Sequence, residues 1–292
     1  MQMKNHIRIT VAILLMLPLT AFGQSRLRRL SYYSHFVHDT MHVVVLLPSH
    51  YDPAHAYPVL FLLHGYGGDQ NDWTTKTNLV EYTSHIRLIV VMPEAKNSWY
   101  VDSQTDPRAK YEDYVIRELP EFVNKRFPID TTREAIAGLS MGGYGALMLG
   151  LRYPHKFQFI GDLSGAITTP EIIDSMLDVP GFNLGTQRGI MPSIIKAFGK
   201  NDKRFRDAHN VFDLIEKDPP ATIPYIFMAA GTQDGYIEFR PADHAFIDSL
   251  HAHGDTRYEY HELPGQHDWK FWNKEVRPML RRMAEIMELR NQ

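Results

Sequence analysis

A serine flanked by glycines occupies residues 138–142, whose sequence is Gly-Leu-Ser-Met-Gly. Glycines two positions away on either side allow the serine to sit on a sharp turn between a strand and a helix, with its hydroxyl exposed. The preceding residues 133–137 are typical of a short buried strand, and residues 143–150 are typical of a tightly packed helix. The motif therefore predicts that Ser140 is a nucleophile for acyl transfer, and the alternative is a serine that caps a helix.

A serine hydroxyl reacts only when a nearby base removes its proton, and an acid must orient that base. Asp234 follows the strand pattern of residues 224–230, and His267 follows that of residues 258–263. In proteins with this serine motif, the acid and the histidine come after the serine in that order. We therefore predict that Asp234 is the acid and His267 the base.

The chain has 15 histidines and many aspartates, so both assignments have competitors. Asp268 is the main competitor for the acid role, but the immediate neighbour of His267 can hardly reach the same ring with good geometry. Capping of the following helix suits Asp268 better. Asp213 and Asp248 are lesser competitors on predicted helices. Most histidines are expected at the surface, and none forms a convincing metal cluster.

The oxyanion of an acyl-transfer reaction needs two backbone N–H donors. One is expected from Met141, directly after the nucleophile. The other is expected from the glycine-rich residues 64–68, where we favour the amide of Tyr66. An ordinary glycine-rich turn is the alternative for this segment, and His64 is expected to be structural.

Three residues and one long segment are expected to border the substrate. Trp99 and Tyr100 are suited to stacking on a sugar or an aromatic acyl group, with a simple lid over the core as the alternative. Gly65 belongs to the same predicted binding set. Residues 166–221, rich in proline, glycine and charge, are expected to form an insertion that caps Ser140.

The elements around these residues predict an α/β-hydrolase fold: a mostly parallel central sheet with an N-terminal antiparallel hairpin and helices on both faces. Residues 30–37 and 41–47 resemble paired antiparallel strands, whereas the later apolar runs are continuous, as in strands buried on both faces. The small residues Gly142, Ala146 and Gly150 would let the helix after Ser140 lie close to the sheet. The other expected strands are 58–63, 88–92, 157–163, 225–230 and 258–263, and the other expected helices are 111–127 with a kink at Pro120, 240–251 and 269–289.

The first residues differ from the rest of the chain. Lys4 and Arg8 precede an apolar run at residues 11–17, and small residues precede Gln24. This pattern predicts a signal peptide over residues 1–23 and export to the periplasm or the medium. The apolar run is short for a membrane span, and an uncleaved anchor helix is the alternative.

Composition limits the function classes that remain. Of the 292 residues, 44% are apolar and 22% charged, which is enough for one large domain over residues 24–292. The net charge of −3, with scattered basic residues, argues against nucleic-acid binding. The absence of cysteine excludes disulfides, a cysteine nucleophile and thiolate metal sites. No metal or organic cofactor is implied, and the oligomeric state is not determined.

Four motifs together resemble the esterase D-like group: residues 64–68, 98–100, 138–146 and 265–269. That group includes tributyrin esterases, S-formylglutathione hydrolases, the mycolyltransferases, and the feruloyl and acetylxylan esterases of carbohydrate esterase family one. The resemblance covers nearly all of the mature chain. It implies a serine carboxylesterase that works through an acyl-enzyme.

Residue by residue, the resemblance matches the nucleophile, acid and base to Ser140, Asp234 and His267, and the oxyanion amides to Tyr66 and Met141. Feruloyl or acetyl esters on plant polysaccharides are the expected substrates. The alternatives are a short-chain acyl esterase, a thioesterase like the S-formylglutathione hydrolases, and an acyltransferase in which an alcohol replaces water. A non-catalytic binding module fits poorly, because the full set of catalytic residue types is present.

Overall fold

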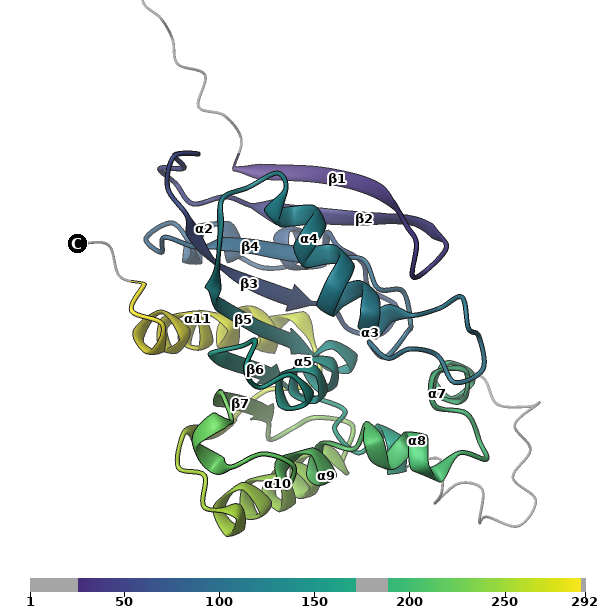
Figure 1. Ribbon diagram of the computed structural model, residues 1–292. Helices are drawn as coiled ribbons and strands as arrows, with labels where there is room; N and C mark the ends of the chain where they lie inside the picture. Colours follow the sequence, from purple (N-terminus) through teal and green to yellow (C-terminus); the bar gives the residue numbers. More distant parts are fainter. Residues whose placement is uncertain (1–25, 172–188, 290–292) are drawn as a thin grey trace, which may run out of the picture.

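The structure is a computed structural model that describes residues 26–171 and 189–289. Within these residues eight strands form one sheet in the order β1-β2-β4-β3-β5-β6-β7-β8 (Figure 1). The antiparallel pair of β1 and β2 lies at one edge, β2 pairs antiparallel with β4, and all later pairs are parallel. The strands are β1 (Leu27–Ser34), β2 (Asp39–Leu46), β3 (Tyr57–Leu63), β4 (Ile89–Pro93), β5 (Ile129–Leu139), β6 (Phe159–Leu163), β7 (Tyr225–Gly231) and β8 (Tyr258–Leu263). The predicted mostly parallel sheet with an N-terminal hairpin is confirmed.

Successive residues of a strand point to opposite faces of the sheet, and β3 shows why its sequence is apolar throughout. Val59 and Phe61 belong to the core on one face, whereas Leu60 and Leu62 belong to the core on the other. All four side chains are buried. Helices cover both faces, so no position of these four in β3 is left for a polar residue.

The helices divide between the two faces. The face that contains Phe61 is covered by helices α3 (Tyr111–Asp113), α4 (Leu119–Asn124), α5 (Met141–Arg152), α7 (Met191–Phe198), α8 (Lys203–Ala208), α9 (Val211–Ile215) and α10 (Phe239–His253). The opposite face is covered by α1 (Asp72–Thr75), α2 (Leu79–Tyr82) and the long α11 (Trp269–Ile286). Each helix therefore contributes its apolar side to one of two core layers.

The crossover helix expected at residues 111–127 is divided by a π-helical turn, η1 (Tyr114–Glu118). The turn ends just before Pro120, and the N–H of Leu119 bonds to the carbonyl of Tyr114, five residues earlier. Proline has no N–H with which to continue the normal ladder. A wider turn thus lies just ahead of Pro120, where the helix is expected to kink.

Helix α5 lies very close to the sheet, as its small residues predict. A β-carbon on Gly142 would be 2.6 Å from the carbonyl oxygen of His64, and one on Gly138 would be 2.3 Å from the carbonyl oxygen of Gly142. No side chain fits at either position. The turn at Ser140 is therefore held between backbone segments at the carboxyl ends of the central strands.

Two of the expected segments lie wholly or partly outside the described residues. The expected signal peptide at residues 1–23 is one, and positions 172–188 of the expected cap at residues 166–221 are the other. The described remainder of that insertion forms α7, α8 and α9. In the portions of the chain with described coordinates, no helix combines the length and apolar character that a membrane crossing needs.

Candidate active site

Ser140 occupies the sharp turn between β5 and α5 in a strained backbone conformation, with φ 52° and ψ −117°. A non-glycine residue in such a conformation costs about 1–3 kcal/mol, so the surroundings must hold it. The Ser140 N–H donates to the carbonyl of Leu163 at 3.0 Å, and the Ser140 carbonyl accepts from Tyr144 and Ala166 at 3.0 and 3.2 Å. These bonds tie the turn to the end of β6 and present its side chain at the carboxyl edge of the sheet.

Asp234 and His267 lie in the loops that follow β7 and β8, next to each other at the same edge of the sheet. The two loops are joined by backbone hydrogen bonds, from Thr232 to the carbonyl of Leu263 and from Gln233 to the carbonyl of Gly265, both at 2.9 Å. The acid and the base are therefore positioned by backbone contacts as well as by their own side chains.

The three side chains form a continuous hydrogen-bonded series. His267 Nε2 lies 2.9 Å from Ser140 Oγ, and His267 Nδ1 lies 2.8 Å from Asp234 Oδ2. The Asp234 side chain is only 2% exposed, and its Oδ1 accepts from the N–H of Tyr236 at 2.8 Å. An ionised carboxylate only accepts hydrogen bonds, so Nδ1 of His267 carries the proton and Nε2 is free to accept the serine proton. The geometry is that of a serine made nucleophilic by a base.

Asp268, the main competitor for the acid role, and His64 both have structural roles. Asp268 accepts a hydrogen bond from the N–H of Phe271 at 2.9 Å and so caps the start of α11. His64 is buried, with Nδ1 2.7 Å from the carbonyl oxygen of Gly65 and Nε2 accepting from the N–H of Ala95 at 2.9 Å. Burial lowers the pKa of His64. Its neutral ring thus joins the loop after β3 to the loop after β4.

The expected oxyanion donors belong to two different segments. Met141 is the first residue of α5, and Tyr66 lies in the loop after β3. Neither backbone N–H bonds to another described residue. Two uncommitted donors beside a nucleophile could stabilise developing negative charge, and their role remains a prediction.

A cavity of about 570 Å³ opens over Ser140. Gly65 lines it, as expected, together with Tyr66, Ala166 and Ile190. Its wall also includes Asp72 of α1 and Lys76, the residue directly after that helix, which form an ion pair at 2.8 Å. Small-molecule sites have volumes of about 300–1,000 Å³, so the cavity has room for a ligand well beyond an acetyl group.

The expectation that Trp99 and Tyr100 stack on a substrate is wrong for this structure. Their side chains are 1% and 0% exposed, and neither lines the cavity. A β-carbon on Gly145 would be 2.5 Å from the ring of Tyr100, so that ring fills the notch left by the glycine in α5. The Tyr100 hydroxyl donates to the carbonyl of His64 at 2.8 Å, and Trp99 Nε1 donates to Ser193 Oγ at 3.0 Å. Both residues are packed against the core, which is the alternative that the sequence left open.

Three aromatic residues that the sequence patterns did not indicate surround His267. The rings of Tyr236, Phe239 and Trp272 lie 4.8, 5.6 and 5.0 Å from the His267 ring, and all three residues line the cavity. Tyr236 is two residues after the acid and Trp272 is five after the base. Proximity in sequence to Asp234 and His267 was the signal that could have identified them.

A pair of buried acids behind the site was also missed. Asp162 of β6 and Asp243 of α10 are both 1% exposed, and Oδ1 of each lacks a hydrogen-bond partner among the described residues. Burial raises the pKa of Asp162 to about 8. Burial and the charge of Asp162 raise the pKa of Asp243 to about 9, with Glu262 and Asp234 adding to the shift and Tyr260 opposing it. In the folded protein these shifts favour the protonated form of each carboxyl group over its charged form.

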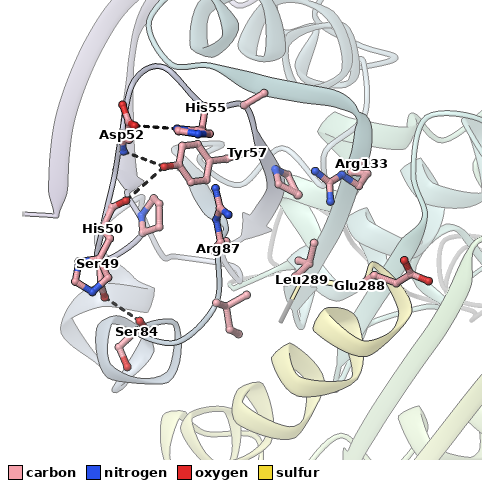
Figure 2. A pocket seen from close by; sticks show the side chains of 14 residues that line it. Ser49, His50, Asp52, His55, Tyr57, Ser84, Arg87, Arg133, Glu288 and Leu289 are labelled. Atoms are coloured by element: carbon pink, nitrogen blue, oxygen red, sulfur yellow. Dashed lines mark hydrogen bonds and ion pairs between the residues drawn. The ribbon is translucent and has the colours of Figure 1, made fainter. Parts of the chain in front are cut away.

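A second cavity, of about 750 Å³, lies at the opposite end of the sheet, where β3, β4 and β5 begin (Figure 2). His55 and Asp52 lie 2.8 Å apart there, but the nearby Ser49 hydroxyl donates to the carbonyl of Ser84. No hydrogen-bonded serine, histidine and aspartate series lines this cavity. In the described ranges, no three histidine, aspartate or glutamate side chains converge as a metal site would require.

The strained serine turn, the series from serine through histidine to aspartate and the mostly parallel sheet define a serine hydrolase with the α/β-hydrolase fold. The comparisons with known proteins agree. The chain belongs to the esterase family, since the family described as "Putative esterase" matches residues 34–283. The protein is therefore an enzyme of the serine hydrolase class that acts on esters.

Individual relatives support the same assignment. The chain is 32% identical over 234 residues to an acetyl esterase of Caldicellulosiruptor saccharolyticus, covering 78% of this chain and 84% of that protein. It is similar to the substrate-bound structure of FphF, a fluorophosphonate-binding serine hydrolase of Staphylococcus aureus, with 25% identity, a TM-score of 0.72, and 89% and 98% of the two chains covered. A ferulic acid esterase structure with 22% identity shares the fold, with a TM-score of 0.73 over 91% of this chain and 99% of the other.

Proposed function

We propose that the protein is an exported serine carboxylesterase that hydrolyses feruloyl or acetyl esters on plant polysaccharides. The observation that carries the catalytic part is the hydrogen-bonded series of Ser140, His267 and Asp234 at the floor of a cavity. Ser140 is the proposed nucleophile, His267 the general base and Asp234 the group that orients the imidazole. These roles follow from the atoms that each side chain presents to the next.

The proposed reaction has two half-steps. His267 Nε2 accepts the hydroxyl proton of Ser140 as Oγ forms a bond to the ester carbonyl carbon. The bond to the alcohol oxygen then breaks, and His267 returns the proton to that oxygen, which leaves an acyl group on Ser140. Water attacks this acyl-enzyme in the same way and releases the acid. The N–H groups of Tyr66 and Met141 are the proposed donors to the oxyanion in both half-steps.

The substrate class is supported by two kinds of observation. The relative described above with 32% identity is named an acetyl esterase, which favours short acyl groups. The cavity of about 570 Å³ and its aromatic wall of Tyr236, Phe239, Trp269 and Trp272 favour a larger group that contains a ring. Both features suit esters attached to sugars, because an aromatic wall binds a pyranose face as well as a phenyl ring.

Export is proposed from the signal-like residues 1–23. The test is to express the full chain in a bacterium, separate periplasm and medium from cytoplasm and membranes, and determine the N-terminus of the recovered protein. We expect a chain that begins at Gln24 outside the cytoplasm. A full-length chain retained with the membrane would support the anchor alternative instead.

The catalytic proposal is tested by measuring hydrolysis of 4-nitrophenyl acetate and methyl ferulate by the wild type and by Ser140→Ala. In a comparable serine enzyme, loss of the nucleophile lowers kcat by about 10⁶-fold, so Ser140→Ala should be essentially inactive. A fluorophosphonate probe should label the wild type at Ser140, as located by mass spectrometry, and leave the variant unlabelled. Equal hydrolysis by both proteins would exclude Ser140 as the nucleophile.

A further inference from the structure

Exposed apolar side chains gather at the mouth of the cavity over Ser140. In the described part of the chain, five large apolar side chains are exposed, and Tyr66, Tyr236 and Ile237 are three of them. Tyr66 and Tyr236 line the cavity, and Ile237 follows Tyr236 at 79% exposure. We call Tyr66, Tyr236 and Ile237 the apolar rim. Exposed apolar groups that concentrate at one site mark a surface that binds a ligand.

Tyr236 is held in place although it is 44% exposed. Its N–H donates to Asp234 Oδ1 at 2.8 Å, which fixes its backbone to the acid. Its ring stacks on that of Phe239, with the ring centres 4.9 Å apart and the planes 10° from parallel. Phe239 itself is buried, at 5% exposure. A ring supported in this way loses little further freedom when a ligand stacks on it.

Tyr66 is also held by a contact. The Tyr66 hydroxyl donates to the carbonyl of Gly189 at 3.1 Å. Ala166 and Ile190 add apolar surface to the same cavity. The cavity therefore presents flat or apolar groups where an ester would extend away from Ser140. Such a surface favours a planar partner over a small alkyl group.

We propose that Tyr236 is a specificity-determining residue that selects esters with a planar ring by stacking on that ring at the cavity mouth. This inference rests on the proposed esterase function and adds the residue that sets its substrate preference. Ring stacking is the shared chemistry, and the ring can belong to the acid or to the alcohol of the ester. Tyr236 contacts the substrate in this proposal, whereas Phe239 positions Tyr236.

The test compares three esters: methyl ferulate, with a ring in the acid; phenyl acetate, with a ring in the alcohol; and ethyl acetate, with no ring. Tyr236→Ala should lower kcat/KM for at least one ring ester, relative to ethyl acetate, by about threefold to tenfold, which is the effect that one stacking contact supports. The change should come from KM. The ring ester whose kcat/KM falls shows whether the bound ring belongs to the acid or to the alcohol.

Tyr236→Phe should keep the wild-type preference, because the stacking surface remains. Tyr33→Ala is the matched control, since Tyr33 is 54% exposed on β1 and does not line the cavity. Thermal melts of each variant, with Tyr236→Leu as a second loss of the ring, establish that the comparison is made on folded protein. An unchanged preference in both Tyr236→Ala and Tyr236→Leu would overturn the inference. An equal fall in kcat for all three esters would also overturn it, because Tyr236 would then act only by positioning Asp234.

The two proposals fail in different ways. If the wild type hydrolyses ethyl acetate, Ser140→Ala does not, and the ring preference is independent of Tyr236, only the specificity inference is wrong. If the wild type hydrolyses none of the three esters, or Ser140→Ala hydrolyses them equally well, the proposed function is wrong and the inference is wrong with it.

Discussion

Gly231 and Gly265 lie in direct backbone contact beneath the acid and the base. A β-carbon on Gly231 would be 2.5 Å from the carbonyl oxygen of Gly265. The same Gly265 carbonyl accepts the N–H of Gln233 at 2.9 Å, so the contact and the hydrogen bond together set the separation of the two loops. The distance between Asp234 and His267 therefore depends on the absence of a side chain at Gly231.

Gly231→Ala is expected to push the two loops apart and to lower kcat by about 100-fold, since a displacement of about 1 Å in a reacting group can have that effect. The expected change in KM is small, because Gly231 does not line the cavity. Steady-state kinetics with 4-nitrophenyl acetate measure both values. Gly235→Ala is the matched control: no atom lies within 4 Å of its added β-carbon. Similar activities in the two variants would show that the glycine contact does not set the site.

Asp234→Asn is expected to lower kcat by up to about 10⁴-fold if the serine-protease precedent carries over. The asparagine amide can turn its NH₂ group toward Nδ1 of His267 and favour the tautomer in which Nε2 carries the proton. Such a ring cannot accept the proton of Ser140. The measurement is single-turnover acylation by 4-nitrophenyl acetate, with Asp213→Asn on the exposed surface of α9 as the control. A wild-type acylation rate in Asp234→Asn would remove Asp234 from the mechanism.

Asp162 and Asp243 predict that the protein loses stability as the pH rises. Their folded-state pKa values, about 8 and about 9, lie above the ordinary value of 3.8, so the folded protein binds more protons than the unfolded chain between those limits. The free energy of unfolding should therefore fall as the pH rises from about 4 toward about 8. Asp162→Asn replaces the protonated acid by a neutral group of the same shape.

Urea unfolding at about pH 5, 6, 7 and 8 measures how the free energy of unfolding depends on pH. We expect Asp162→Asn to flatten the decline and to be more stable than the wild type at the highest pH. Asp248→Asn, on the exposed part of α10, should follow the wild-type curve. Parallel curves for wild type and Asp162→Asn would mean that the buried pair is not the source of the pH dependence.

Glu112 predicts a pH dependence of the opposite sign. Burial alone would raise the pKa of Glu112, but hydrogen bonds from His209 and Tyr153 and the charge of Arg152 outweigh burial and lower it. The stabilisation is present above the ordinary pKa of 4.5 and is lost as the pH falls through the lowered value. Glu112 joins α3 to α5 and to the end of α8. Its loss should therefore lower the free energy of unfolding and leave the rate of ester hydrolysis by the folded protein unchanged.

Glu112→Ala is expected to reduce the free energy of unfolding by about 3–5 kcal/mol at pH 7, since it leaves buried partners without their carboxylate. Chemical denaturation provides the measurement. Glu121→Ala is the control, because the Glu121–Lys125 pair is exposed and should contribute little. If Glu112→Ala and Glu121→Ala lower the free energy of unfolding by similar amounts, the burial of Glu112 does not make its ion pairs more important for stability.

Much of the fold followed from local patterns. The continuous apolar runs marked β3 and β4 because strands buried on both faces have no polar position, and the small residues of α5 marked its close approach to the sheet. The division of the crossover helix by η1 did not follow, since a proline predicts a break in the ladder without fixing how the preceding turn adjusts. Features set by the residue types of one segment were predictable. The π-helical turn was not, because it depends on how neighbouring helical turns adjust to one another.

The residues of the hydrogen-bonded series could be predicted from the sequence, whereas the aromatic residues of the cavity wall could not. Ser140, Asp234 and His267 could be selected from sequence because each follows a strand, and parallel strands bring their carboxyl ends to one edge. Trp99 and Tyr100 misled because the residue type is the same for a ring that stacks on a ligand and for one that fills a notch. The notch at Gly145 comes from another segment, so exposure at position 100 could not be read locally.

The sequence by itself determined the serine turn, the chain order of Ser140, Asp234 and His267, and the strands that precede them, because each of these features is recognised from the residues next to it. The tertiary structure alone decided which aromatic rings line the cavity and which are buried in the core. It also decided that Asp162 and Asp243 are buried, each with one carboxyl oxygen that lacks a hydrogen-bond partner among the described residues. The physical reason is that side-chain exposure and the pKa of a buried acid are set by neighbours from distant segments. Those neighbours are fixed only when the chain has packed.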